Sequence, residues 1–203
     1  MKVLYVTDRA TAGDERLDAI LSSLAGASNL SVQLREKGTP DREVLAWGRR
    51  CRERLGPDSI LYINRRFDIA MAAGAHGVQL PADGLPVGRL RANTPRGFRI
   101  GVSTHSPREA RAAIAEGADL VLIGPIFRTP SKEASGPPLS PAVLEELPRA
   151  HEHRADVLAI GGVDESNLDR LEPYRNRISG IAAIRLFQEA ADPRAVAERI
   201  ARR

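Results

Sequence analysis

The sequence predicts a single (β/α)8 barrel, the TIM-barrel fold of the α/β class, and three observations carry this prediction. Short apolar runs recur eight times along the 203 residues, and a polar, helix-like stretch follows each run. Most of the runs are continuously apolar rather than alternating, which is typical of parallel strands buried on both faces. The runs lie about 20 to 35 residues apart, which is enough for a strand, a helix and two loops. We therefore expect residues 1–203 to form one domain.

The helix starts support this alternation. The expected strands cover residues 3–7, 30–34, 60–63, 77–80, 99–103, 120–124, 157–161 and 180–184. Thr39, Ser106 and Ser140 each precede a proline, which places a capping side chain before a proline at the first helical position. Ser106 with Glu109 makes a capping box, and Asp192 is expected to cap the last helix. A doubly wound open sheet is the alternative, but its glycine-rich turn is absent after the first run.

Composition narrows the function classes. The net charge is +4 and aromatic residues make up only 4%, while the arginines are scattered rather than gathered in one patch. This pattern does not favour a nucleic-acid binder, whereas an anionic small molecule fits the charge. No apolar run approaches the roughly 20 residues of a membrane helix, and the N-terminus lacks a signal-peptide layout. We therefore expect a cytoplasmic protein without a membrane partner, and the sequence leaves a homo-oligomer open.

In a barrel the chemistry lies on the loops that follow the strands, so the residues after each run are the candidates. After the second run, alternation puts Gln33, Arg35 and Lys37 on one side of the chain. A Gln, an Arg and a Lys together suit a polar heterocycle and a phosphate. The alternative is a solvated strand end with a salt bridge through Glu36. After the third run, Asn64 either donates its amide to an anion or closes a turn.

Histidine and hydroxyl groups follow the fifth and sixth runs. His105 lies where the fifth strand meets its helix, and histidine suits proton transfer near neutral pH, although a structural role is the alternative. The loop after the sixth run contains Thr129, Ser131 and Lys132 and is long for a barrel. We interpret it as a mobile lid over an anion, with an ordinary surface loop as the alternative.

The ends of the seventh and eighth runs predict a phosphate site. Barrel enzymes often hold phosphate with these two loops and a helix N-terminus. Gly161 and Gly162 let the backbone approach a ligand, and Ile184 and Arg185 follow the eighth run. No metal constellation stands out, because the carboxylates of Asp8 and Asp83 are isolated in the sequence, so we expect no metal site.

The whole chain resembles the thiamin phosphate synthase and thiazole tautomerase (TenI-like) superfamily. The segments that carry the resemblance are YVTDR at 5–9, VQLREK at 32–37, GVSTHS at 101–106, GPIF at 124–127, TPSK at 129–132 and AIGGV at 159–163. They occur in order from the first expected strand to the seventh. Together they are specific for the superfamily and less specific for its branches.

The resemblance implies roles for individual residues. Gln33 would contact the pyrimidine of a synthase substrate, and His105 matches the proton shuttle of tautomerases, which synthases often carry too. Gly162, with the backbone near Ile184 and Arg185, matches the pocket for the thiazole phosphate. The positions that match the family's diphosphate-binding residues are Arg35, Lys37, Asn64, Ser103, Ser131 and Lys132.

Three departures from the family pattern bear on the branch. Synthases usually follow the strand-three Asn with a Mg2+-binding Asp, and Arg65 stands there instead. The second Mg2+-binding Asp falls on Gly84, although Asp83, one residue earlier, could compensate. Arg185 replaces a usual Ser after strand eight, so a guanidinium would make the phosphate contact there.

The resemblance and its departures favour a thiamin biosynthesis enzyme that acts on a phosphorylated thiazole, as a metal-independent thiazole tautomerase. In this hypothesis His105 moves a proton between ring positions and no cofactor is required. The alternative is thiamin phosphate synthase, a transferase that joins hydroxymethylpyrimidine diphosphate to thiazole phosphate and would use Mg2+. A barrel that binds thiamin phosphates without catalysis is a further alternative.

Overall fold

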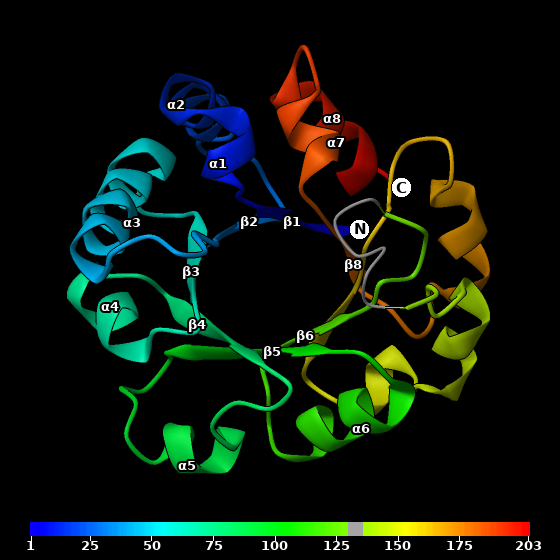
Figure 1. The fold of residues 1–203 in the computed structure, drawn as a ribbon. Helices are drawn as coiled ribbons and strands as arrows, with labels where there is room; N and C mark the ends of the chain where they lie inside the picture. Colours follow the sequence, from blue (N-terminus) through cyan, green and yellow to red (C-terminus); the bar gives the residue numbers. More distant parts are fainter. Residues whose placement is uncertain (130–135) are drawn as a thin grey trace. The chain divides into compact units, whose positions relative to one another are not determined.

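The computed structural model describes residues 1–129 and 136–203, and its strands form a closed parallel barrel in the order β1 to β8 (Figure 1). This confirms the predicted (β/α)8 fold class. The strands are β1 (Lys2–Val6), β2 (Leu30–Leu34), β3 (Ile60–Asn64), β4 (Gly77–Pro81), β5 (Arg99–Thr104), β6 (Leu120–Ile123), β7 (Asp156–Ile160) and β8 (Gly180–Ala183). Each strand begins and ends within one residue of its expected range. The candidate site residues Ser131 and Lys132 lie outside the described residues.

The chain divides into two compact units. The first unit contains Met1–Gln79 and Ile184–Arg203, and the second contains Leu80–Ala183. We describe each unit by itself, and the expected single-domain organisation stays a prediction.

The first unit contains β1 to β3, most of β4 and the helices that pack on them. The strands pair in parallel, with Val6 opposite Gln33, Leu34 opposite Ile63 and Asn64 opposite Gln79. In Figure 1, α2 and α3 lie on the outer side of these strands. The helices of this unit are α1 (Arg9–Ala12), α2 (Asp14–Ser23), α3 (Asp41–Leu55), α4 (Phe67–Ala72), α7 (Arg185–Gln188) and α8 (Pro193–Ala201).

The sequence of α3 shows why such a helix forms and how it packs. Its first turn carries acidic residues and its last turn carries arginines, which complements the helix dipole. The buried positions recur at three- and four-residue spacing, so one face packs on the sheet; they are Val44, Trp47, Gly48, Cys51 and Leu55. The helix ends at Gly56, whose φ of +77° suits glycine. Burial raises the pKa of the Cys51 thiol to about 12, so the thiol stays protonated near neutral pH.

The second unit contains β5 to β8, and here 3-10 turns replace several barrel helices. The parallel register places Thr104 opposite Ile123, and Ala159 opposite both Ile123 and Ile181. In Figure 1, α6 lies beside β5 and β6. The helical elements are α5 (Val87–Arg91), α6 (Pro107–Ala115), η2 (Pro141–Glu146), η3 (Ala150–Glu152) and η4 (Leu168–Tyr174).

Two of the expected helix caps are present and two are not. The Ser106 side chain accepts a hydrogen bond from the Glu109 N–H at 3.2 Å, and Asp192 caps α8 in the same way. Thr39 makes no cap, because α3 begins after Pro40 and has no capping side-chain hydrogen bond. Ser140 also makes no capping hydrogen bond, and its φ of +68° leads into a 3-10 turn rather than an α-helix.

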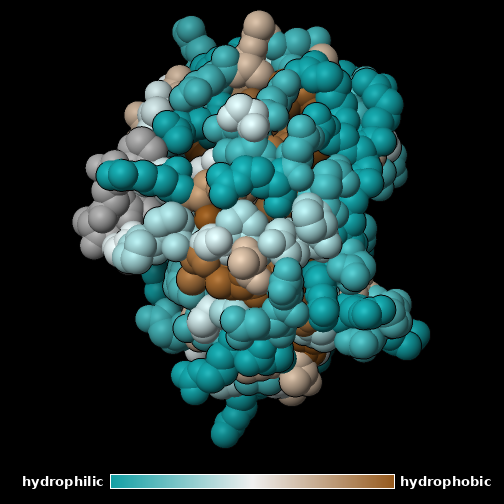
Figure 2. All heavy atoms as spheres, turned by 90° about the vertical axis from the view of Figure 1, so that its right-hand side faces the viewer, coloured by the Kyte–Doolittle hydropathy of each residue, from teal (hydrophilic) through white to brown (hydrophobic). Residues whose placement is uncertain are grey.

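None of the helices in the described part of the chain is long and apolar enough to cross a membrane. The face shown in Figure 2 is mostly hydrophilic, with small hydrophobic areas between polar side chains. Met71 and Leu85 are the large apolar side chains exposed among the described residues, at 42% and 63%. Isolated apolar side chains of this kind are normal on a protein surface.

Candidate functional site

The polar ends of β2 and β3 meet in the first unit. Gln33 is 2% exposed, and its Nε2 donates a hydrogen bond to Asn64 Oδ1 at 3.0 Å. The pairing uses the oxygen of Asn64, so its NH2 group is the part that can donate to an anion. Gln33 Oε1 is buried and has no hydrogen-bond partner among the described residues. Because an unsatisfied buried acceptor is costly, this oxygen favours a ligand that brings a donor.

A buried carboxylate holds the segment that contains Arg35 and Lys37. The side chain of Glu36, which lies between them in the sequence, is only 4% exposed. The Thr7 hydroxyl donates to Glu36 Oε1 at 2.7 Å and accepts from the Arg35 N–H at 3.0 Å. Arg9 Nε lies 3.6 Å from Glu36 Oε2, so the salt bridge named as an alternative is present. It anchors the segment through Glu36 and does not engage the Arg35 guanidinium.

The sequence analysis named a salt bridge through Glu36 only as an alternative and did not identify its partners. Alternation placed Glu36 on the side away from Arg35 and Lys37, and that placement alone does not indicate a partner. The partners Thr7 and Arg9 come from the preceding strand end, 29 residues away in the case of Thr7. A hydroxyl at the end of β1 beside a carboxylate after β2 was the available signal, since neighbouring parallel strands end side by side.

Two arginines follow β3 and have different surroundings. Arg66 forms hydrogen bonds with Asp68 at 2.9 and 2.5 Å and an ion pair with Asp41, so its guanidinium is satisfied. Arg65 is exposed, and its guanidinium forms no hydrogen bond or ion pair within the described ranges. Its φ is +64°, and its N–H donates to the Gln79 carbonyl at 2.8 Å.

In the second unit His105 is held at the end of β5. Its ring Nδ1 lies 2.8 Å from the Gly124 carbonyl oxygen, and because a carbonyl can only accept, Nδ1 carries the proton. The His105 N–H donates to Glu109 Oε2 at 2.7 Å, which ties this loop to α6. The ring is exposed, so Nε2 is the nitrogen that can face a ligand. Ser103 lies two residues earlier, on β5, and is half-buried.

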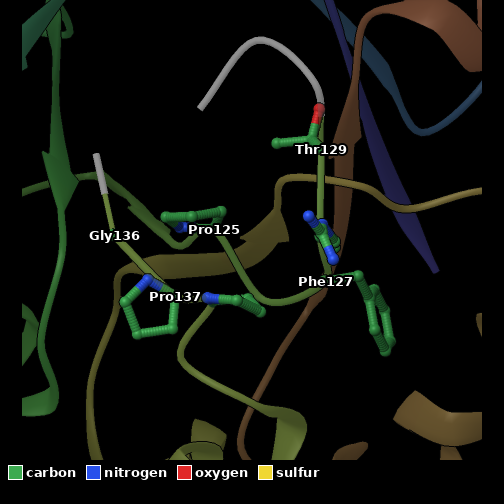
Figure 3. Close-up of a pocket in the computed structure, with 7 residues that line it drawn as sticks. Pro125, Phe127, Thr129, Gly136 and Pro137 are labelled. Carbon is green, nitrogen blue, oxygen red and sulfur yellow. The ribbon is translucent and has the colours of Figure 1, made fainter. Parts of the chain in front are cut away.

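A pocket of about 410 Å³ lies against the loop that follows β6 (Figure 3). It is lined by Pro125, Phe127, Arg128, Thr129, Gly136, Pro137 and Pro138. Figure 3 shows the Phe127 ring turned away from Pro125 and Pro137. The Arg170 guanidinium covers that ring at 5.0 Å from its centroid. Thr129 is the one expected site residue in this lining.

Gly161 and Gly162 allow two loops to approach closely. Both have positive φ, +96° and +65°. A Cβ on Gly162 would lie 2.4 Å from the Arg128 carbonyl oxygen, and one on Gly161 would lie 2.5 Å from Pro125 Cα. The glycines are therefore required by packing, whether or not an anion binds here. Ile184 and Arg185 start the C-terminal part of the first unit, where Ile184 is half-buried and Arg185 is exposed at the start of α7.

The donor set does not fit the Mg2+ site that the resemblance implies. Across residues 1–129 and 136–203, no group of three or more His, Cys, Asp or Glu side chains is placed to hold a metal ion. Asp83 is exposed and does not rebuild such a group with other carboxylates of the described chain. A Cβ at Gly84 would lie 3.0 Å from the Pro81 carbonyl oxygen, so this turn is tight for a carboxylate-bearing residue.

The sequence of this chain is similar to a known protein family and to individual members of it. Residues 3–187 match the family described as thiamine monophosphate synthase. A putative thiamine-phosphate synthase of Geobacter sulfurreducens is 38% identical over 192 residues, which cover 93% of this chain and 87% of the relative. The thiamine-phosphate synthase of Methanoculleus marisnigri is 42% identical over 167 residues, or 81% of this chain and 78% of the relative.

Solved structures of other proteins also resemble this chain. A thiamine phosphate pyrophosphorylase from Pyrococcus furiosus has a TM-score of 0.78 and 26% identity to this chain, covering 99% of this chain and 94% of the other. A 3-hexulose-6-phosphate synthase has a TM-score of 0.67 at 19% identity, covering 98% of each chain, which is a likeness of fold alone.

These relatives correct the expected activity. The sequence favoured a metal-independent thiazole tautomerase, an isomerase, and this prediction is wrong. The relatives are named thiamine-phosphate synthases, so the alternative, a transferase, is favoured. The proton-shuttle role of His105 was part of the tautomerase hypothesis, and no contact of the described residues tests it. The two lost carboxylate positions carried more weight in that prediction than the retained polar groups of β2 and β3.

The first prediction concerns Glu36. Burial raises the pKa of its carboxyl, although the Thr7 hydrogen bond and Arg9 oppose the shift. The folded protein then holds this proton more tightly than the unfolded chain, so the contribution of Glu36 to stability is greatest below the unfolded pKa and is lost as the pH rises through the folded pKa. Glu36→Gln replaces the carboxyl with an amide that does not ionise, so the variant does not lose stability through ionisation at this position. In denaturant titrations, the free energy of unfolding of the variant, relative to wild type, should rise as the pH increases above the pKa of a glutamate in an unfolded chain, about 4.3.

Glu43→Gln is the matched control for Glu36→Gln. Glu43 also lies 3.6 Å from an Arg9 nitrogen, but its side chain is 46% exposed. Its substitution should leave the difference from wild type nearly constant over the same pH range. Parallel pH profiles for the Glu36 variant and wild type would contradict the burial argument.

The second prediction concerns the glycines after β7. Gly162→Ala should lower the free energy of unfolding by about 2 kcal/mol or more, because the new Cβ meets backbone atoms and φ is positive. Gly88→Ala is the control, since Gly88 lies in α5 and nothing lies within 4 Å of the place its Cβ would take. That variant should be neutral or gain up to about 1 kcal/mol. Equal effects in urea unfolding would show that the close approach at Gly162 is not a constraint.

Proposed function

Because the chain belongs to the thiamine monophosphate synthase family, we propose that it is a transferase of thiamin biosynthesis. It joins hydroxymethylpyrimidine diphosphate to thiazole phosphate, releasing diphosphate and forming thiamin phosphate. The bond between the pyrimidine methylene carbon and the diphosphate oxygen breaks, and a bond from that carbon to the thiazole nitrogen forms. The thiazole nitrogen supplies the electron pair of the new bond, and the diphosphate oxygen keeps the pair of the broken one.

The observation that carries this proposal is the buried Oε1 of Gln33, which has no hydrogen-bond partner among the described residues. An aminopyrimidine presents an N–H group that can satisfy such an acceptor. The hydrogen bond from Gln33 to Asn64 fixes the orientation of the amide, so the acceptor is held in place before substrate binds. A site built to hydrogen-bond one group discriminates strongly against analogues that lack it.

Cationic and polar groups beside Gln33 support binding of the diphosphate. Arg35 and Lys37 follow Gln33 at alternate positions, and the Glu36 anchor holds their backbone. Preorganised donors of this kind stabilise the charge that develops on a leaving group. Within the first unit we assign the same role to Asn64. The roles that the resemblance implies for residues of the second unit stay predictions; these residues are Ser103, Thr129, Ser131 and Lys132.

The resemblance implies that residues after β7, in the second unit, and after β8, in the first, contact the thiazole phosphate, and this stays a prediction. Gly161 and Gly162 follow β7, and Ile184 and Arg185 follow β8. This assignment rests on the phosphate sites that barrel enzymes often place after their last two strands. No step is assigned to a protein-bound metal, because the donor set does not fit one.

The third prediction tests the reaction and the Gln33 assignment together. Purified protein with both substrates should form thiamin phosphate and diphosphate, measured by chromatography with and without added Mg2+. Gln33→Leu removes the acceptor at similar size, and it should raise KM for the pyrimidine diphosphate by about 10-fold or more. The KM for thiazole phosphate should change little.

Thermal unfolding of Gln33→Leu is the control for its fold. Protein that binds thiazole phosphate and never forms product would contradict the transferase proposal and would favour a non-catalytic binder. A Gln33→Leu variant with unchanged KM values would overturn the pyrimidine assignment and leave the reaction standing.

The fourth prediction concerns His105. The proposed step breaks a C–O bond and forms a C–N bond without moving a proton, so it needs no general base. His105→Ala should therefore keep kcat within about 10-fold of wild type, whereas loss of a general acid or base typically costs roughly 10²–10⁴-fold. A larger loss, with a pH profile that changes in the variant, would show that proton transfer limits the rate.

A further inference from the structure

Two arginine side chains stand without ionic partners after neighbouring strands of the first unit. Arg35 follows β2 and Arg65 follows β3, and neither guanidinium has a hydrogen bond or ion pair with any residue that the structure describes. β2 and β3 pair with Gln33 opposite Tyr62 and Leu34 opposite Ile63. Continuing this register places Arg35 level with Asn64, and Arg65 one position further along the chain.

In contrast to Arg65, the neighbouring Arg66 forms ion pairs with carboxylates. Arg66 is held by Asp68 and Asp41, and these hydrogen bonds raise its pKa further. Carboxylates are therefore within reach of this segment, and they engage Arg66 rather than Arg65. An arginine that stays unpaired beside acidic neighbours is available for an anionic ligand.

The backbone fixes where the Arg65 side chain starts. Its N–H donates to the Gln79 carbonyl at 2.8 Å, which extends the β3–β4 pairing by one residue. Its φ of +64° is uncommon for a residue with a side chain. A residue in this conformation costs free energy, so the surrounding hydrogen bonds must hold it there. The guanidinium therefore projects from a fixed point rather than from a mobile loop.

We propose that the guanidinium of Arg65, together with that of Arg35, binds the diphosphate of the substrate directly and replaces a protein-bound divalent cation. This inference rests on the proposed function. Arg65 stands at the position where the resemblance implies a metal-binding carboxylate, and a guanidinium repels a metal ion instead of holding it. Two guanidinium groups supply fixed positive charge and planar, two-pronged hydrogen bonding to phosphate oxygens.

The fifth prediction measures binding of inorganic diphosphate by isothermal titration calorimetry in EDTA. Wild-type protein should bind it without any divalent cation. Arg65→Asn is the main variant, because asparagine tolerates positive φ and preserves the backbone. It should weaken binding by about 10-fold or more, since it removes a charge-assisted contact. The diphosphate affinity of Arg65→Lys should lie between the affinities of wild type and Arg65→Asn, because an ammonium is a point charge without the planar fork of a guanidinium.

Arg49→Ala is the matched control. Arg49 is an exposed arginine of α3, so its loss changes the net charge by the same amount away from the strand ends. This variant should bind diphosphate as wild type does, and thermal unfolding of all variants checks their folds. Equal binding by Arg65→Asn and wild type, or binding by wild type only when Mg2+ is added, overturns the proposal.

The two proposals fail separately. Diphosphate binding in EDTA that depends on Arg65, with no thiamin phosphate formed, would refute the synthase and keep the anion site. Thiamin phosphate formation with diphosphate binding that does not depend on Arg65 would keep the synthase and refute the arginine substitution. No binding of diphosphate under either condition refutes the inference as well.

Discussion

The hydrogen bond from Gln33 to Asn64 exists because β2 and β3 pair in parallel and in one register. Parallel pairing brings the carboxyl ends of sequential strands together, so polar residues separated by a helix become neighbours. The same constraint sets Thr7 beside Glu36 and ties Arg65 to Gln79. These contacts of the candidate site in the first unit therefore follow from backbone pairing, because the residues that form them lie at the carboxyl ends of paired strands.

The second unit uses pairing in a different way. Beyond β6 the chain continues beside the end of β7, where the N–H groups of Ile126 and Phe127 donate to the carbonyls of Ile160 and Gly161 at 2.9 Å each. This approach leaves no room for side chains at the contact, since a Cβ on Gly124 would lie 2.0 Å from the Ile160 carbonyl oxygen. The glycines at these strand ends are thus explained by packing, and the anion site proposed here is a separate role that packing does not require.

The sequence predicted what depends on local pattern. Continuous apolar runs located all the strands, and the Ser106 cap followed from residues three positions apart. The sequence could not predict which of several charged side chains would form an ion pair with a given carboxylate. Arg65 and Arg66 are adjacent and chemically identical, and only the placement of Asp41 and Asp68 decides that Arg66 is engaged. The site residues Ser131 and Lys132 lie outside what the structure describes, so their assignments stay predictions.

The tautomerase prediction is wrong although the two carboxylate positions are lost. Carboxylates at those positions would stabilise a leaving diphosphate only by holding a cation. A chain that loses the ligands and gains a guanidinium at the same point exchanges one positive charge for another. Opposite charges attract whether the positive one belongs to a metal or to an arginine, although the arginine is fixed to the chain. In our proposal, the guanidinium of Arg65 supplies the positive charge that a metal ion would otherwise supply to the diphosphate.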